Sequence, residues 1–252
     1  IEIAHIGWLR KIPSVIVNED DWNIVPLFAW LGYPFCSKIL APQCCSTGRW
    51  HQKTVFYAGY HELAYLHPDY FIPDIEIARP LFKNSSHYFI IRFSELTAYH
   101  DAGITGLHQG MVKEIIKILE SFGNVYITSE KELDPELEPY RMQLHPLDIH
   151  HALAFADIFI GDSQTMTAEA AVLGTPALRF NDFVGRIGYL EELEHRYQLT
   201  FGYQTCQSDA LLNKLKELLA IQNLKEVWKQ RQKQMLDEKI DLNQLMFNLY
   251  NE

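Results

Sequence analysis

The 252-residue sequence lacks the cysteine patterns, the basic charge and the long apolar runs that mark several large protein classes. Its four cysteines include no C-x-x-C pair, so we predict free thiols and no metal site. The 22 Lys and Arg are outnumbered by 32 Asp and Glu, and the net charge of -10 argues against a nucleic-acid partner. No apolar run approaches the roughly 20 residues of a membrane span, and no signal peptide is recognisable, so we expect a cytoplasmic protein without a membrane span.

The sequence does have the composition of a globular protein with a packed core. Hydrophobic residues make up 48% and charged residues 21% of the chain. The length is sufficient for one large domain or two modest ones. The chain opens at Ile1 within an expected helix that runs to about Leu9, without an initial Met. We therefore expect the natural protein to extend further toward its N-terminus.

Alternating strands and helices predict the fold class. Short apolar or β-branched runs are typical of buried strands at 14–17, 38–40, 53–57, 88–93, 125–128, 157–160, 177–180 and 199–201. Helical periodicity indicates helices at 22–30, 111–122, 147–155, 208–220, 224–238 and 242–250. A turn into a short helix is expected at 59–66, and a further helix is expected between the turn 161–163 and the stop at 174–176. Asp20 or Asp21 is the expected cap of the helix at 22–30, and the proline-containing stretch 67–80 is expected to be an irregular linker. The pattern predicts an α/β protein with doubly wound parallel sheets.

One segment, Gly161–Pro176, has the clearest functional pattern. A Gly-Asp-Ser turn follows one expected strand and leads into a helix that carries Glu169. The backbone N–H groups of such a turn, from Gly161 to Thr165, are suited to a phosphate, and a carboxylate further along the helix can reach sugar hydroxyls. The alternative is that Ser163 simply caps the helix. Because Glu169 stands among alanines, we favour a nucleotide-sugar site formed by Gly161, Asp162, Ser163, Gln164, Thr165 and Glu169.

Other polar groups follow the expected strands, at the edge where ligands of such sheets bind. They are Glu19–Asp21, Gly59–Glu62, Arg92 with the loop 94–106, and Asn181–Asp182 with Arg186. Arg92 has the planar fork that suits a diphosphate; the alternative is a salt bridge to a loop acid.

Two residues are candidates for a general base. His100 lies in the loop that faces the expected cleft, and Glu19 follows the first strand on the opposite side. The alternatives are a surface histidine and a solvated acidic loop. His145, His150 and His151 do not predict a metal site, because the last two are adjacent and point in different directions on a helix.

The spacing of Ser163, Glu169 and Gly174-Thr175-Pro176 resembles the nucleotide-binding signature of the UDP-N-acetylglucosamine 2-epimerases and related GT-B glycosyltransferases. In that family the serine contacts the diphosphate region and the glutamate holds the ribose. The stretch 57–68, YAGYHELAYLHP, resembles more closely an uncharacterised prokaryotic GT-B-like family. The sequence departs from the epimerases at Arg92, which is followed by Phe93 where they have an Arg-His pair.

The resemblance covers about residues 3–250 and implies two Rossmann-like domains with a cleft between them. We assign 1–82 to a partial first domain with a linker, 83–238 to a nucleotide-binding domain, and 239–252 to a helix that packs back on the first domain. The expected function is metal-independent sugar transfer from a UDP- or GDP-sugar, with no further cofactor, to a glycan or small-molecule acceptor. A homodimer is one expected assembly. The alternatives are a nucleotide-sugar epimerase or hydrolase and a non-catalytic GT-B binding module.

Overall fold

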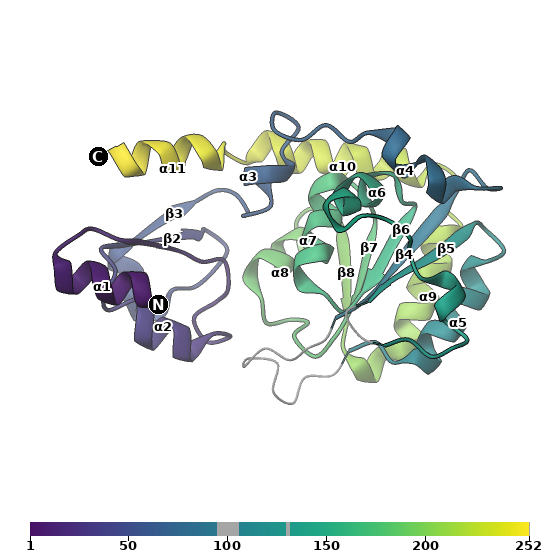
Figure 1. Cartoon of the computed structure of the whole chain (residues 1–252), viewed down its shortest axis with the longest axis horizontal. Helices are drawn as coiled ribbons and strands as arrows, with labels where there is room; N and C mark the ends of the chain where they lie inside the picture. Colours follow the sequence, from purple (N-terminus) through teal and green to yellow (C-terminus); the bar gives the residue numbers. More distant parts are fainter. Residues whose placement is uncertain (95–105, 130–131, 252) are drawn as a thin grey trace.

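The computed structural model describes residues 1–94, 106–129 and 132–251 and contains two parallel β-sheets, each packed with helices (Figure 1). The strand order is β1-β2-β3 in the first sheet and β5-β4-β6-β7-β8 in the second. Parallel neighbours need crossover connections, which the intervening helices provide. We refer to the parts built on the two sheets as the first and the second domain. The predicted fold class, two Rossmann-like α/β domains, is confirmed.

The first sheet is small and has packed residues on both faces. Ile39 packs with helix residues on one face, and Leu40 packs with Tyr57 and Leu242 on the other. Adjacent strand residues point to opposite faces, which explains this division. The elements are α1 (Glu2–Arg10), β1 (Val15–Val17), α2 (Pro26–Gly32), β2 (Lys38–Pro42), the 3₁₀ helix η1 (Gly48–Lys53) and β3 (Thr54–Tyr57).

Helix α2 begins later than its apolar spacing predicts. Its first residue is Pro26 and its N-cap is Val25, so the predicted start at Trp22 and the predicted cap by Asp20 or Asp21 are wrong. Proline is favoured at the first helical position, where its missing N–H costs nothing. The ring of Pro26 therefore determines where α2 begins.

The segment between the two sheets is more regular than its prolines suggest. It contains α3 (Leu63–Leu66) and α4 (Ile75–Phe82), so the predicted irregular linker is wrong over the second helix. The Asp74 side chain caps α4 by accepting from Glu76 N at 2.9 Å. Pro80 lies within α4, but Ala78 and Leu81 are buried, and this packing offsets the lost backbone hydrogen bond.

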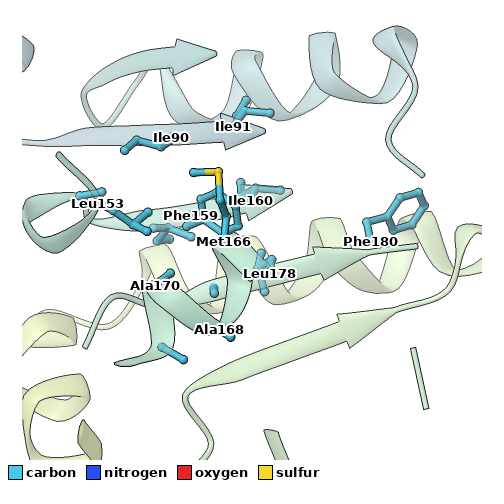
Figure 2. Packing of buried hydrophobic residues seen from close by; sticks show 14 of the residues in the cluster. Ile90, Ile91, Leu153, Phe159, Ile160, Met166, Ala168, Ala170, Leu178 and Phe180 are labelled. Atoms are coloured by element: carbon cyan, nitrogen blue, oxygen red, sulfur yellow. The ribbon is translucent and has the colours of Figure 1, made fainter. Parts of the chain in front are cut away.

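The second sheet has an apolar core on both faces. Ile90, Phe159 and Leu178, on three adjacent strands, are fully buried, and Figure 2 shows them packed with residues of α7. Figure 1 places α7 and α8 on the side toward the first domain, with α5 and α9 on the far side. The elements are β4 (Tyr88–Phe93), α5 (Gln109–Leu119), β5 (Asn124–Ser129), η3 (Glu138–Tyr140), η4 (Pro146–Asp148), α6 (Ile149–Phe155), β6 (Ile158–Gly161), α7 (Gln164–Leu173), β7 (Ala177–Phe180), α8 (Gly188–His195), β8 (Thr200–Tyr203), η5 (Thr205–Gln207), α9 (Ser208–Leu219) and α10 (Leu224–Glu238).

The last helix, α11 (Leu242–Asn251), lies on the first domain (Figure 1). Leu242 is 2% exposed and packs with Leu40 and Tyr57. Asn243 Nδ2 donates to Ala64 O at 2.8 Å. Within the described ranges, neither α11 nor any other helix has the length and apolarity needed to cross a bilayer.

Candidate functional site

The order of the second sheet places its topological switch point between β4 and β6, and we refer to the strand ends at this point as the β4–β6 crevice. Strand β4 pairs with β5 on one side and with β6 on the other. The chain therefore adds β5 on one side of β4 and then adds β6, β7 and β8 on the opposite side. Ligands of open parallel sheets bind at the carboxyl ends of the strands on either side of such a point. At this point Arg92 lies in register with Gly161 on one side and with Thr128 on the other.

Gly161 permits β4 and β6 to approach closely at the crevice. A Cβ at this position would lie 2.8 Å from Phe159 Cζ and 3.0 Å from Arg92 Cβ, closer than carbon atoms pack. Arg92 is half-buried, and its Nη1 donates to Thr128 Oγ1 at 2.9 Å. The guanidinium is therefore held at the strand end by a residue of the neighbouring strand.

The N-terminus of α7 opens at the same edge. Ser163 is the N-cap, and its Oγ accepts from Met166 N at 3.3 Å. Gln164 and Thr165 form the first turn, whose N–H groups have no carbonyl partner within a helix. The capping interpretation of Ser163 is thus correct, and it leaves the first N–H groups of α7 available to an anion.

Asp162 organises the crevice through backbone contacts. Its carboxylate accepts from Ser94 N at 2.7 Å and from Leu107 N at 3.3 Å. These two residues flank the segment 95–105, which lies outside the described residues and includes the predicted base His100. Asp162 O accepts from Asn181 Nδ2 at 2.8 Å. Asp162 therefore joins the ends of three strands, and the structure gives no position for His100.

Glu169 lies two turns into α7 and is 7% exposed. Its Oε1 accepts from the hydroxyl of Tyr65 on α3 at 3.0 Å and lies 2.9 Å from His150 Nε2 on α6. Burial, followed by the charge of Glu169, raises the pKa of Tyr65, so this hydroxyl remains a donor. Neither partner was predicted from the sequence. Oε2 makes no hydrogen bond with the described residues and is the oxygen that a ligand could engage.

The three histidines that were weighed as metal ligands have structural partners. His151 Nδ1 accepts from Asp74 N at 2.9 Å, and His145 Nδ1 accepts from Leu147 N at 3.3 Å. In the described part of the chain, no three His, Cys, Asp or Glu side chains converge as a metal site.

Glu19 lies on the first domain, in the loop after β1, and its charge interacts with that of Glu169 on α7. Its Oε2 accepts from His61 N at 3.2 Å, and its side chain is 16% exposed. Burial raises the pKa of Glu19 to about 7, and the charges of Asp20 and Glu169 contribute to this increase. Burial also lowers the pKa of His61 to about 4, so the imidazole beside Glu19 is neutral at neutral pH.

The turn that follows β3 contains polar groups without partners. Glu62 is fully buried, and neither of its carboxylate oxygens has a hydrogen-bond partner among the described residues. The hydroxyl of Tyr57 and the Nε2 of His61 are also buried without partners. Buried polar groups are nearly always hydrogen-bonded, so this cluster is unusual. From the sequence, the Gly59–Glu62 turn is predicted only as one of the polar groups that follow an expected strand, and its buried cluster is not predicted.

Direct contacts join the two domains around the crevice. Asp21 Oδ2 accepts from Gly188 N, the first residue of α8, at 2.7 Å. Glu192 Oε2 accepts from the Tyr60 hydroxyl at 2.5 Å and from Lys239 Nζ at 2.6 Å. Both domains therefore contribute groups to one interface.

A buried arginine was not anticipated as a site residue. Arg179 on β7 is 1% exposed, and its Nη2 donates to Glu191 Oε1 at 3.3 Å. Its Nε and Nη1 have no hydrogen-bond partner in the described part of the chain. In the sequence, Arg179 is a single charged residue within an apolar strand and has no evident partner. Its contact with Glu191 depends on how α8 packs on the sheet.

No protein-family model and no curated protein sequence matches the chain. Solved structures match nearly all of it. HepE of Anabaena, solved with UDP and glucose, has a TM-score of 0.63 and 15% identity, covering 99% of this chain and 74% of its own. MnaA of S. aureus, solved with UDP, has a TM-score of 0.62 and 12% identity, covering 94% of this chain and 68% of its own.

A UDP-N-acetylglucosamine 2-epimerase structure has a TM-score of 0.57 and 14% identity, covering 99% of this chain and 69% of its own. The chain spans 72%, 65% and 66% of the length of three further glycosyltransferase and epimerase structures. At these identities the likeness establishes the fold. The chain has the GT-B fold, and its structural neighbours are GT-B glycosyltransferases and UDP-N-acetylglucosamine 2-epimerases.

Proposed function

We propose that this protein binds a nucleotide-diphospho-sugar between its two domains and transfers the sugar to a hydroxyl of a glycan or small-molecule acceptor. The observation that supports this most strongly is the arrangement at the β4–β6 crevice. Arg92, the N-terminus of α7 and Glu169 follow one another along one edge, and Glu19 lies on the opposite domain. The UDP-bound neighbours share this fold.

The second domain would hold the nucleotide. Arg92 and the first N–H groups of α7 would bind the diphosphate, because a guanidinium and a helix N-terminus both favour negative charge. The free Oε2 of Glu169 would accept from a ribose hydroxyl. This scheme uses no metal, since these groups supply the positive field themselves.

Glu19 would act as the base from the first domain. The acceptor hydroxyl oxygen forms a bond to the anomeric carbon, the bond from that carbon to the diphosphate breaks, and the hydroxyl proton passes to Glu19. A base with a pKa of about 7 is well matched to this step at neutral pH. The departing nucleoside diphosphate keeps the electron pair of the broken bond, and Arg92 would stabilise its charge.

Epimerisation of the nucleotide sugar is less compatible with the crevice. The residue after Arg92 is Phe93, which is 3% exposed and belongs to the apolar core. The position thus provides no imidazole to the crevice, whereas the epimerases have a histidine there. Product analysis by NMR separates transfer from epimerisation, from hydrolysis and from a binding module without turnover.

Calorimetric titration with UDP, UDP-glucose, UDP-N-acetylglucosamine and GDP-mannose tests the binding proposal. We expect Arg92→Ala and Glu169→Gln each to weaken binding of the preferred nucleotide sugar about tenfold or more, as expected for loss of a charge-assisted contact. Arg10→Ala removes an exposed arginine of α1 and is the matched control for charge. Absence of binding by the wild-type protein, or equal affinities in Arg92→Ala and Arg10→Ala, would contradict the proposal.

A further inference from the structure

We propose that Glu62 is the proton-carrying residue of a pH-dependent latch between the two domains. With the carboxyl protonated the domains close as in this structure, and ionisation of the carboxyl separates them. This inference is independent of any nucleotide sugar.

Glu62 lies at the centre of the interdomain contacts. Tyr60, two residues earlier, donates to Glu192 of α8, and Tyr65, three residues later, donates to Glu169 of α7. The turn that carries Glu62 is therefore held to the second domain on both sides. A change of charge at Glu62 acts directly on the surface that the two domains share.

The surroundings of Glu62 compensate a negative charge only weakly, because its own backbone N–H lowers the pKa of the carboxyl less than burial and the charge of Glu19 raise it. The residue is 0% exposed, so water does not solvate it, and its two oxygens have no hydrogen-bond partner among the described residues. An ionised carboxylate in such a place costs far more free energy than a neutral one. Burial is the main cause that raises the pKa of Glu62 well above its usual range, and the charge of Glu19 adds to it.

The charged groups that raise the pKa of Glu62 are carboxylates, and the other groups whose pKa its charge raises are tyrosines. The groups whose charges interact with it from the packed elements are Glu19 and Asp20 after β1, Tyr57 on β3, Tyr65 on α3, Glu169 on α7 and Tyr189 on α8. The nearby Lys239 ammonium is engaged by Glu192 at 2.6 Å. The cluster thus supplies repulsion to an ionised Glu62 and no salt bridge.

The direction of the pH effect follows from proton linkage. An unfolded glutamate titrates near 4.5, and Glu62 in the closed structure titrates well above that value. Between these two pKa values the closed state binds more protons than the open or unfolded state, so its stability falls as pH rises. Glu19, with a pKa of about 7, contributes in the same direction.

The test compares the wild-type protein with Glu62→Gln between pH 5 and pH 8.5, using small-angle X-ray scattering and thermal unfolding. In the wild type we expect the radius of gyration to increase with pH and the Tm to fall by about 5–10 °C more than in Glu62→Gln. Hydrogen exchange of the 57–66 and 164–173 segments should accelerate over the same range in the wild type, beyond the intrinsic pH dependence of exchange. Glu114→Gln removes an exposed carboxylate of α5 and should keep the wild-type response.

A wild-type protein without a pH response, or a Glu62→Gln protein that keeps the full response, would overturn the latch. If Glu62→Gln does not fold, Glu62→Leu removes the charge without adding an amide. A pH response in Glu62→Leu that is smaller than in the wild type, with only the part due to Glu19 remaining, supports the latch, and a full wild-type response overturns it. Loss of the response in Glu114→Gln would show that general charge repulsion is the cause, and it would overturn the assignment to Glu62.

Discussion

At the shared interface, the two domains differ in how their buried carboxylates are bonded. Glu169 of α7 in the second domain is hydrogen-bonded by Tyr65 and His150. Glu62 of the first domain is buried, and its carboxylate has no hydrogen-bond partner among the residues that the structure describes.

The two sheets also differ in their number of strands and in the size of their buried core. The second sheet has five strands with fully buried residues such as Ile90 and Leu178, and the first has three. A large core holds a binding site in a fixed geometry. Buried polar groups without partners destabilise the structure that contains them, and binding of a ligand or a proton can remove this cost. Under the proposed function, the second domain would bind the nucleotide sugar and the first domain would supply the base for the transfer.

The change that tests this division most strongly is Glu19→Gln. The first domain then loses its base, and we expect turnover of the preferred nucleotide sugar to fall by roughly 10²- to 10⁴-fold, the usual contribution of a positioned base. Nucleotide affinity should change little, because Gln keeps the size of the side chain. Calorimetry and a steady-state assay measure the two quantities separately.

The same assay gives a pH signature. A base must be ionised to accept a proton, so wild-type turnover should rise with pH through the Glu19 pKa of about 7. At higher pH it should fall again, where ionised Glu62 opens the domains under the proposed latch. Glu226→Gln, an exposed change at the start of α10, is the control and should keep both rate and profile. Equal turnover in Glu19→Gln and wild type would show that the base lies elsewhere, and His100 would be the next candidate to test.

The second domain should respond most to Gly161→Val. The added carbons have no room between Phe159 and Arg92, so we expect a loss of about 1–3 kcal/mol in the free energy of unfolding, as for overpacked cores, together with weaker nucleotide binding. Urea denaturation and calorimetry provide the two readouts.

Gly110→Ala on α5 is the control for Gly161→Val, because the nearest atom to its new Cβ is the His108 imidazole at 3.3 Å. We expect a change of less than about 1 kcal/mol, since alanine is the better helix former but the exposed His108 ring that caps α5 must shift slightly. If Gly161→Val were as stable as wild type, the close approach of β4 and β6 would not be required.

Sequence patterns predicted the second domain well because its elements have local causes. Ser163 at the N-cap and Gly174 in a left-handed conformation, with φ of 77°, set the ends of α7 as the sequence indicates. The parallel pairing of the strands that carry Arg92 and Gly161 agrees with the sheet type that the alternating pattern predicts, whereas their register is found only in the structure.

The interface could not be predicted in this way, because its contacts are long-range. Glu169 meets Tyr65 and His150 from separate helices, and nothing in the local sequence pairs them. The prolines of the segment 67–80 predict an irregular linker, because proline disfavours a helix locally. The α4 helix forms nevertheless, because tertiary packing of Ala78 and Leu81 stabilises it.

A smaller effect is expected where the first domain caps a helix of the second. Asp21 accepts from Ser46 N and from Gly188 N, each at 2.7 Å. Asp21→Ala leaves both N–H groups without this acceptor, so we expect a loss of about 1–2 kcal/mol in stability and a larger radius of gyration. Asp237→Ala, an exposed change on α10, is the control. If the two variants were equally stable and equally compact, the capping contact would contribute nothing to domain closure.

The smallest effect is expected at Ser163, where a hydrogen bond within the second domain ends a helix that is already well packed. Ser163→Ala removes the acceptor of Met166 N, and loss of an N-cap side chain costs about 1 kcal/mol. Ser163→Asn keeps a capping oxygen and should restore stability. If nucleotide affinity falls in the alanine variant and returns in the asparagine variant, the cap holds the first turn of α7 in the geometry that binds phosphate. If affinity stays low in Ser163→Asn while stability recovers, the hydroxyl itself contacts the ligand, and the binding role of the second domain extends to this side chain.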